Sequence, residues 1–276
     1  MTGDGRPDGR PDGRPDGPLH VRGEVLAAKT AGAFRHLTLV APGIGERSRP
    51  GSFLAVSVGE ASLARRALWI HRVRAVGGHR AAIDVVVEPG GTGTRWLAAL
   101  SPGTRLEITG PLGRPFSLPR EQARCLLVGE GYAAAPLLAL SERLRERGCA
   151  VRLVLCGPDE GHLLDVLETR RTVGRVEVVT GDPTAAVAAA LPDADVVYAA
   201  GTTRTLRLCA DAAAAAGVSC QVALEQPLTC ATGLCHGCPV PVLDDDGSTH
   251  VVRDCVDGPV FRAGRLDWDL IDPEAP

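Results

Sequence analysis

Four cysteines near the C-terminus have a spacing that could hold a metal cluster. Cys230, Cys235, Cys238 and Cys255 follow the pattern C-x4-C-x2-C-x16-C. This is the spacing of plant-type [2Fe–2S] ligands, in which three cysteines lie in one loop and the fourth arrives from a separate segment. Small residues between the first three, among them Gly233, allow the backbone to come close to the inorganic sulfides.

Other uses of these cysteines remain open. A structural zinc site usually shows two C-x2-C pairs, and only one pair here is that tight. His236 could act as a ligand, but a Rieske centre needs two histidines, each paired with a cysteine. The five other cysteines fall in strand or helix patterns, where we expect buried packing thiols; they are Cys125, Cys149, Cys156, Cys209 and Cys220.

Composition narrows the function classes. The net charge of −3 does not favour a general nucleic-acid-binding surface, and aromatic residues make up only 3% of 276 residues. No apolar run is long enough to predict a membrane span, and no signal peptide is expected, so the prediction is a cytoplasmic protein. Residues 5–16 are three copies of Gly-Arg-Pro-Asp, and we predict a disordered tail over 1–18. No general base or nucleophile triad stands out, so no catalytic residue is predicted.

The elements that must position the cysteines fall into three parts. Up to residue 112 the chain alternates apolar and polar residues between Gly and Pro clusters, which predicts a small antiparallel barrel with one short helix at 94–99. The strands are expected at 21–29, 36–41, 52–58, 67–76, 81–88 and 105–109.

From residue 123 strands and helices alternate, which predicts βαβ units and a parallel sheet. Strands are expected at 124–129, 151–156, 176–179, 196–200 and 221–224, and helices at 134–147, 161–171, 184–190 and 206–216. After Glu225 a cysteine-rich loop leads to short strands near 240–243 and 250–253.

The predicted fold class is therefore a multidomain α+β chain. It combines an antiparallel β-barrel, an α/β parallel-sheet domain and a small C-terminal iron–sulfur module. The expected boundaries are 1–18 for the tail, 19–119 for the barrel, 120–225 for the α/β domain and 226–276 for the cluster module.

The C-terminal motifs resemble those of a known family. Leu-Glu-Gln-Pro-Leu-Thr-Cys at 224–230, Cys-His-Gly-Cys at 235–238 and Arg-Asp-Cys-Val-Asp-Gly-Pro-Val-Phe at 253–261 look like the electron transfer subunit of dihydroorotate dehydrogenase. The resemblance covers residues 20–270 and implies a ferredoxin reductase-like order, with an FAD-binding barrel, a nicotinamide-binding α/β domain and a [2Fe–2S] module. It also implies an FMN-containing catalytic subunit as partner, in a heterotetramer with two copies of each subunit.

The same resemblance implies which residues hold the flavin. An Arg-Pro-x-Ser run in the family corresponds here to Arg66, Ala67, Leu68 and Trp69, so the arginine is kept while Pro and Ser are replaced. The planar guanidinium suits a pyrophosphate. The second element is the run Val86, Val87 and Glu88, followed by a glycine-rich turn with Gly93 and Thr94 that opens a short helix.

The nicotinamide loop departs further from the family. Gly129 and Gly131 are present, but Glu130 between them brings a negative charge to a loop that should meet a diphosphate. Ala200-Gly201-Thr202 stands where the family has Cys-Gly-Pro.

The resemblance implies electron transfer in de novo pyrimidine biosynthesis. Electrons would go from the FMN of the partner through the [2Fe–2S] cluster and FAD to NAD⁺, with NAD(H) as a possible acceptor. Two alternatives stay open: a related reductase subunit for another redox partner, and a divergent flavin-poor subunit that binds a partner and relays electrons without NAD chemistry.

Overall fold

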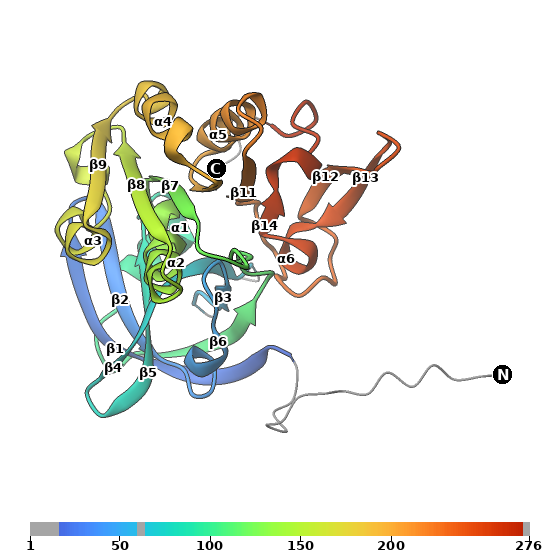
Figure 1. Cartoon of the computed structure of the whole chain (residues 1–276). Coiled ribbons are helices and arrows are strands. Elements are labelled where there is room, and N and C mark those ends of the chain that lie inside the picture. The colour runs from blue at the N-terminus through green and yellow to red at the C-terminus, as the bar shows by residue number, and fades with distance from the viewer. Residues whose placement is uncertain (1–16, 60–63, 273–276) are drawn as a thin grey trace, which may run out of the picture.

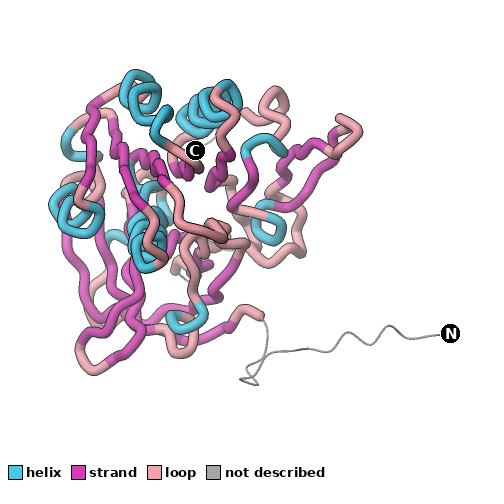
Figure 2. Tube along the Cα trace, viewed as in Figure 1, coloured by secondary structure: helices cyan, strands magenta, loops and turns pink. Residues whose placement is uncertain are grey.

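The computed structural model describes residues 17–59 and 64–272. The predicted tail lies outside these residues except for its last two positions. Within the described residues the chain forms a barrel, a six-stranded sheet with helices and a small hairpin (Figures 1 and 2). The predicted fold class is confirmed, because these are an antiparallel barrel, a parallel-strand sheet and a C-terminal module.

The barrel is closed, with strand order β1-β2-β5-β4-β3-β6, and all of its pairings are antiparallel. Its strands are β1 (Leu19–Ala31), β2 (Phe34–Val40), β3 (Phe53–Val56), β4 (Arg66–Val76), β5 (His79–Val87) and β6 (Arg105–Leu112). The short helix α1 (Thr92–Ala98) lies between β5 and β6, two residues earlier than predicted.

Successive side chains along the barrel strands point alternately into the barrel and outward, so they pack in two different cores. On β2, Leu37 and Leu39 point into the barrel core, whereas Phe34 joins a second core shared with the α/β part. On β4, Leu68 belongs to the barrel core and Trp69 to the shared core. The period of two therefore gives the barrel one face that packs against the rest of the chain.

The α/β part has sheet order β14-β11-β10-β7-β8-β9. Five strands are parallel: β7 (Arg124–Glu130), β8 (Ala150–Gly157), β9 (Arg175–Thr180), β10 (Val196–Ala200) and β11 (Ser219–Ala223). The helices between them are α2 (Ala135–Glu146), α3 (Val166–Val173), α4 (Thr184–Ala190) and α5 (Thr203–Ala215). On α2, Leu137, Leu140 and Leu144 recur at helical spacing and are buried.

The prediction for the helix at 161–171 was wrong at its start. The Asp159 carboxylate accepts hydrogen bonds from the N–H groups of Gly161 and His162, which closes a separate 3₁₀ turn. Leu163 is extended, and α3 begins only after Asp165.

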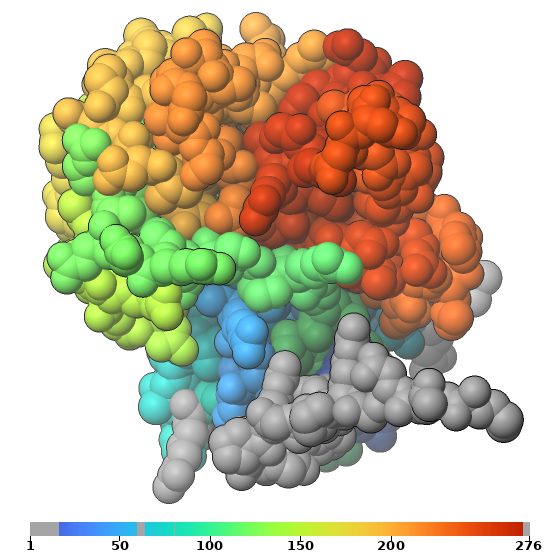
Figure 3. All heavy atoms as spheres, turned by 45° about the vertical axis from the view of Figure 1, so that its right-hand side comes forward, coloured from blue at the N-terminus to red at the C-terminus, as the bar shows by residue number. Residues whose placement is uncertain are grey.

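The C-terminal module carries the hairpin β12 (Pro239–Leu243) and β13 (Thr249–Arg253), followed by the short helix α6 (Asp254–Asp257). The chain then returns to the α/β sheet, where β14 (Val260–Arg262) pairs antiparallel with β11. This edge strand was missed by the sequence analysis, because three residues are too few to show a period. Figure 3 shows the C-terminal residues, in red and orange, packed against the gold residues of the α/β part. No described helix is long and apolar enough to cross a membrane.

Candidate functional site

The loop that carries the first three cysteines directs backbone N–H groups at sulfur atoms. The N–H groups of Thr232 and Cys235 both donate to Cys230 Sγ at 3.4 Å, and that of Gly237 donates to Cys235 Sγ at 3.4 Å. Ala231 and His236 hold positive φ angles of 59° and 57°, which bends the loop around the sulfurs. Such N–H donors favour negatively charged sulfur.

Two of the four cysteine sulfurs form a close, buried pair, and the other two lie outside it. Cys238 Sγ and Cys255 Sγ are buried and 3.5 Å apart, whereas Cys230 and Cys235 lie toward the surface. A tetrahedral zinc site would need all four sulfurs about 3.8 Å from one another, given Zn–S bonds of about 2.3 Å. Among the described residues, no three cysteine sulfurs lie within 4.8 Å of each other. Sulfurs that do not gather around one centre fit a cluster with two irons better than one zinc ion.

The outer Cys230 and the inner Cys255 also differ in the pKa of their thiols. Burial acts to raise the pKa of Cys230, but hydrogen bonds from Thr232 and Cys235 outweigh it and lower this pKa to about 6. Burial, together with the neighbouring Cys238 thiol, raises the pKa of Cys255 to about 12. At neutral pH the outer sulfur of Cys230 is therefore a thiolate that is ready to bind metal.

Arg66 lies at the start of α1. A Cβ atom at Gly93 would come within 2.4 Å of Arg66 Nε, so only glycine lets the guanidinium lie this close to the helix. The predicted anion site at the helix start offers fewer backbone N–H groups than expected. Thr94 Oγ1 already accepts hydrogen bonds from the N–H groups of Gly90 and Gly91 at 3.0 Å. Arg66 thus supplies the positive charge facing this turn, as a flavin pyrophosphate would require.

The other predicted flavin residues divide between two faces. Trp69 and Val86 lie in the shared core with Ala67 packed against it, whereas Leu68 and Val87 lie inside the barrel. The Trp69 ring is buried and packs edge-to-face on Phe53, with ring centroids 6.5 Å apart. Trp69 therefore fills part of the space that faces the α/β domain.

Glu225 connects the barrel, the α/β sheet and the cluster module. Its carboxylate accepts hydrogen bonds from Tyr132 Oη at 2.9 Å and from Trp69 Nε1 at 3.4 Å. Burial raises the pKa of Glu225, although both hydrogen bonds act to lower it. Sequence analysis did not place this residue in the site; its position just beyond a buried strand, at the carboxyl edge of the sheet, was the available signal.

The cluster loop also touches the predicted flavin strand directly. The N–H group of Arg65 donates to the carbonyl oxygen of Thr229 at 3.4 Å, and Thr229 precedes the first cysteine. A small cavity between Trp69, Leu228 and Asp254 lies at the same junction. The structure thus brings the predicted flavin strand and cluster ligands together across about 160 residues of sequence.

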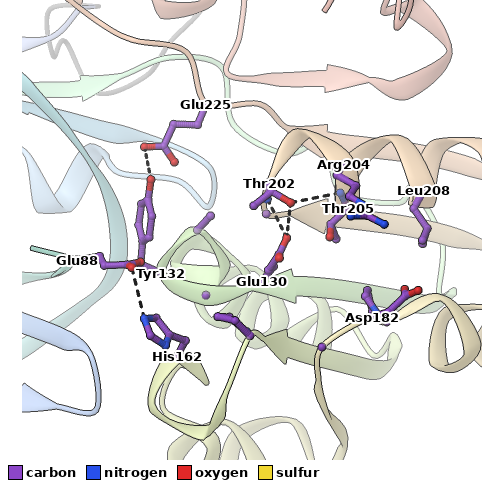
Figure 4. A pocket seen from close by; sticks show the side chains of 16 residues that line it. Glu88, Glu130, Tyr132, His162, Asp182, Thr202, Arg204, Thr205, Leu208 and Glu225 are labelled. Atoms are coloured by element: carbon purple, nitrogen blue, oxygen red, sulfur yellow. Dashed lines mark hydrogen bonds and ion pairs between the residues drawn. The ribbon is translucent and has the colours of Figure 1, made fainter. Parts of the chain in front are cut away.

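A cavity of about 480 Å³ opens at the carboxyl end of the parallel sheet (Figure 4). Gly131, one of the two glycines predicted to bind the nicotinamide cofactor, lines this cavity, while Gly129 packs behind it, where a Cβ would meet the Ala134 side chain at 2.7 Å. Figure 4 shows Glu130 turned toward α5, where its Oε2 accepts the N–H of Thr202 at 3.0 Å and its hydroxyl at 2.7 Å. The carboxylate thus occupies a donor at the start of a helix, where a phosphate would otherwise bind.

The cavity is rich in acidic groups. Four carboxylates line it against one arginine, Arg204, and one histidine, His162; they are Glu88, Glu130, Asp182 and Glu225. His162 Nε2 lies 3.6 Å from Glu88 Oε1, at the end of β5. The cavity has the place and size of a dinucleotide site, but its charge opposes a diphosphate.

Comparison with known proteins gives a consistent picture. Residues 225–267 match the family described as "Iron-sulfur cluster binding domain of dihydroorotate dehydrogenase B". The chain is 30% identical over 241 residues to "Dihydroorotate dehydrogenase B (NAD(+)), electron transfer subunit" of Desulforamulus reducens, covering 83% of this chain and 90% of the relative. It is 32% identical over 234 residues to the protein of the same name from Shouchella clausii, covering 79% and 86%.

Solved structures show the same architecture. A chain of the NADH-dependent reduced ferredoxin-NADP oxidoreductase superposes with a TM-score of 0.78 at 25% identity, covering 90% of this chain and 91% of the other. Phthalate dioxygenase reductase superposes with a TM-score of 0.60 at 19% identity, covering 86% and 77%, and thus shares the fold.

Proposed function

Because the chain belongs to the family of electron transfer subunits of dihydroorotate dehydrogenase B, we propose that it carries electrons from an FMN-containing catalytic subunit through a [2Fe–2S] cluster and FAD to NAD⁺. The pathway is then the oxidation of dihydroorotate in pyrimidine biosynthesis. The cluster accepts single electrons, and the flavin converts between single electrons and hydride. This chain supplies the binding sites, and none of its residues has to act on dihydroorotate.

One observation carries this proposal. The hydrogen bond between Arg65 and Thr229 joins the strand that starts with Arg66 to the loop that starts with Cys230. This contact supports cofactor sites that are neighbours, as electron transfer between them requires. We propose Cys230, Cys235, Cys238 and Cys255 as cluster ligands, with the outer pair on one iron and the inner pair on the other.

For the flavin we propose Arg66 and Gly93 at the pyrophosphate. Ala67, Val86 and Trp69 would face the ring, and Glu88 and Thr94 would border it. Leu68 and Val87 support the site from the barrel core. For the nicotinamide we propose the cavity at Gly131, with Gly129 allowing the close turn of the chain.

The domain division that goes with this function is 19–119 for FAD, 120–225 for nicotinamide and 226–276 for the cluster. Each part has its own sheet, and β14 ties the last part to the second. None of the nine cysteines is joined in a disulfide and four are proposed as cluster ligands, which favours a reducing compartment, and we propose the cytoplasm.

The partner is proposed to dock at the cluster loop. Leu234 is 82% exposed beside Cys235, and Val256, next to Cys255, is 38% exposed. Their position beside two proposed cluster ligands supports a partner at this surface, because electrons from a partner must enter there. We propose that the catalytic subunit covers them, in an assembly with two copies of each subunit.

The test is reconstitution. The purified chain is mixed with an FMN-containing dihydroorotate dehydrogenase catalytic subunit, and NADH formation from dihydroorotate is followed. The proposal predicts dihydroorotate-dependent NADH formation only when both chains are present. No NADH, with both chains folded and loaded with their cofactors, would contradict it.

A second function is favoured by one structural likeness. The similarity to the NADH-dependent reduced ferredoxin-NADP oxidoreductase supports a related reductase subunit that serves another redox partner. Reduced ferredoxin in place of dihydroorotate in the same assay distinguishes the two functions.

A further inference from the structure

Two histidines and an aspartate meet where the barrel packs against the α/β part. His36 lies on β2, His71 on β4, and Asp165 directly before α3, which Figure 1 places beside β2. Among the described residues, this is the one group of three possible metal ligands whose ligand atoms all lie within 4.8 Å of one another. It is separate from the cysteine loop and from the 480 Å³ cavity.

The distances suit a small metal ion. His71 Nε2 lies 3.2 Å from Asp165 Oδ2, and His36 Nε2 lies 3.6 Å from Asp165 Oδ1. Tetrahedral Zn²⁺ with N and O ligands at about 2.0–2.2 Å places neighbouring ligand atoms about 3.3–3.6 Å apart. These two distances run to different oxygens of Asp165, and the two histidine nitrogens lie within 4.8 Å of each other, so the side chains would have to move closer together to bind one ion.

His36 gives an independent indication. It is 6% exposed, and its Nε2 atom is buried with no hydrogen-bond partner. The 3.6 Å distance to the carboxylate is too long for a hydrogen bond. A buried nitrogen left without a partner is unfavourable, and a metal ion would remove that cost.

His71 is oriented as metal-binding histidines usually are. Its Nδ1 lies 2.9 Å from the carbonyl oxygen of Ala135, so this nitrogen carries the proton and donates it. The lone pair is then on Nε2, which faces Asp165. A backbone carbonyl that fixes the other ring nitrogen is the common support of a histidine ligand.

Asp165 completes the set. It occupies the N-cap position of α3 at φ 43°, yet its side chain makes no capping hydrogen bond and turns to the histidines instead. Its two oxygens lie 3.2 Å from His71 Nε2 and 3.6 Å from His36 Nε2, so the carboxylate is placed to share an ion with both rings.

We propose that His36, His71 and Asp165 form a zinc site that fastens the barrel to the α/β domain. Imidazole nitrogen with one carboxylate suits Zn²⁺, and a water molecule would complete a tetrahedron. The Asp165 side chain is 17% exposed and provides a way in for the ion. Ion pairs from Arg72 to Glu142 on α2 and Glu168 on α3 already hold the same junction, at 2.5 and 2.9 Å.

The first test is zinc content. The full chain is loaded with iron and sulfide so that its cysteine site is filled, dialysed against ZnCl₂ and then freed of loosely bound metal with a weak chelator. We expect about one zinc per chain. Zinc K-edge X-ray absorption should show nitrogen and oxygen at about 2.0–2.2 Å and no sulfur at about 2.3 Å.

Three variants separate this site from others. His36→Gln removes a nitrogen that has no hydrogen bond to lose, and Asp165→Asn keeps the shape; each should weaken zinc binding more than about tenfold. His250→Gln is the matched control, because His250 pairs with Asp244 at 2.7 Å on the surface of the hairpin, and it should leave zinc binding unchanged. Circular dichroism checks that each variant is folded.

Three results would overturn the proposal. One is a folded wild-type chain that retains no zinc after cluster loading. Another is retained zinc coordinated by sulfur. The third is zinc affinity equal to that of the wild type in both His36→Gln and Asp165→Asn.

Discussion

The cluster loop and the 480 Å³ cavity use backbone N–H groups in opposite ways. In the loop, the N–H groups of Thr232 and Cys235 point at a cysteine sulfur that can bind metal. In the cavity, the N–H of Thr202 is occupied by Glu130, a side chain of the same protein. Both regions use the same kind of donor, and only the loop directs it at a proposed cofactor ligand.

A backbone N–H group that faces a binding site can bind a ligand only if no side chain of the same protein already accepts its hydrogen bond. The loop bonds persist when metal binds, because their acceptors are the ligands themselves. A dinucleotide phosphate would have to displace Glu130 from Thr202. The cluster end of the electron path is therefore preorganised, and the nicotinamide end is opposed by charge.

The largest expected effect comes from breaking the cluster loop. Cys235→Ser should abolish the [2Fe–2S] absorption bands and electron delivery to NAD⁺, because one iron loses a ligand. Visible absorption and NADH formation are the measurements. Cys220→Ala is the control, since Cys220 is a buried thiol of β11, and it should keep both signals. Retained bands and activity in Cys235→Ser would refute the ligand assignment.

The next effect concerns the flavin. Arg66→Ala should weaken FAD binding about tenfold or more, since a charge-assisted hydrogen bond to phosphate is lost. Fluorescence titration with FAD measures the change. Arg66→Lys keeps the positive charge but not the planar guanidinium, so its FAD affinity should lie between those of the wild type and Arg66→Ala. Equal FAD affinity in all three proteins would mean that Arg66 does not face the pyrophosphate.

At the nicotinamide end, Glu130→Gly should tighten NAD(H) binding about tenfold, or about 1.4 kcal/mol, because a carboxylate leaves the phosphate side of the cavity. Isothermal titration of NADH gives the dissociation constant. Glu130→Gln removes the charge but keeps an oxygen for Thr202, so it separates repulsion from occupation of the N–H group. An NADH dissociation constant that is unchanged in both variants would contradict the claim that Glu130 opposes dinucleotide binding in the cavity.

The smallest effect is a pH dependence at the junction between the two regions. Burial raises the pKa of Glu225, so the folded state keeps a proton that the unfolded chain releases above about pH 4.5. The stabilisation linked to this proton is full at low pH and is lost as pH rises through the folded pKa. Glu225→Gln should therefore gain stability relative to wild type as pH rises.

Urea unfolding of both proteins between pH 5 and pH 8 measures this difference. Parallel curves, with the same stability difference at every pH, would show that Glu225 is not linked to folding in this way.

The sequence predicted the fold class well, because the period of two in the barrel and the alternation of strands and helices are strong local signals. It could not predict the three-residue strand Val260–Arg262, whose pairing with β11 depends on the path of the whole C-terminal module. The start of α3 was wrong because the Asp159 carboxylate closes a separate turn.

The candidate site also combines features that local sequence predicts with contacts between residues far apart in the chain. The proposed ligand set rests on cysteine spacing, because three of its four members lie in one local loop. The contacts of Glu225 with Trp69 and Tyr132 join residues 156 and 93 positions apart, and no spacing rule reveals them. The same is true of His36, His71 and Asp165, which come from two barrel strands and a helix start.

The most direct test of the central claim is anaerobic titration of the purified chain with NADH, followed by absorbance and electron paramagnetic resonance. The account predicts [2Fe–2S] bands together with stoichiometric FAD, bleaching of the flavin by NADH and the resonance of a reduced [2Fe–2S] cluster. A colourless protein that holds zinc at its cysteines, or a cluster without flavin that NADH cannot reduce, would contradict it.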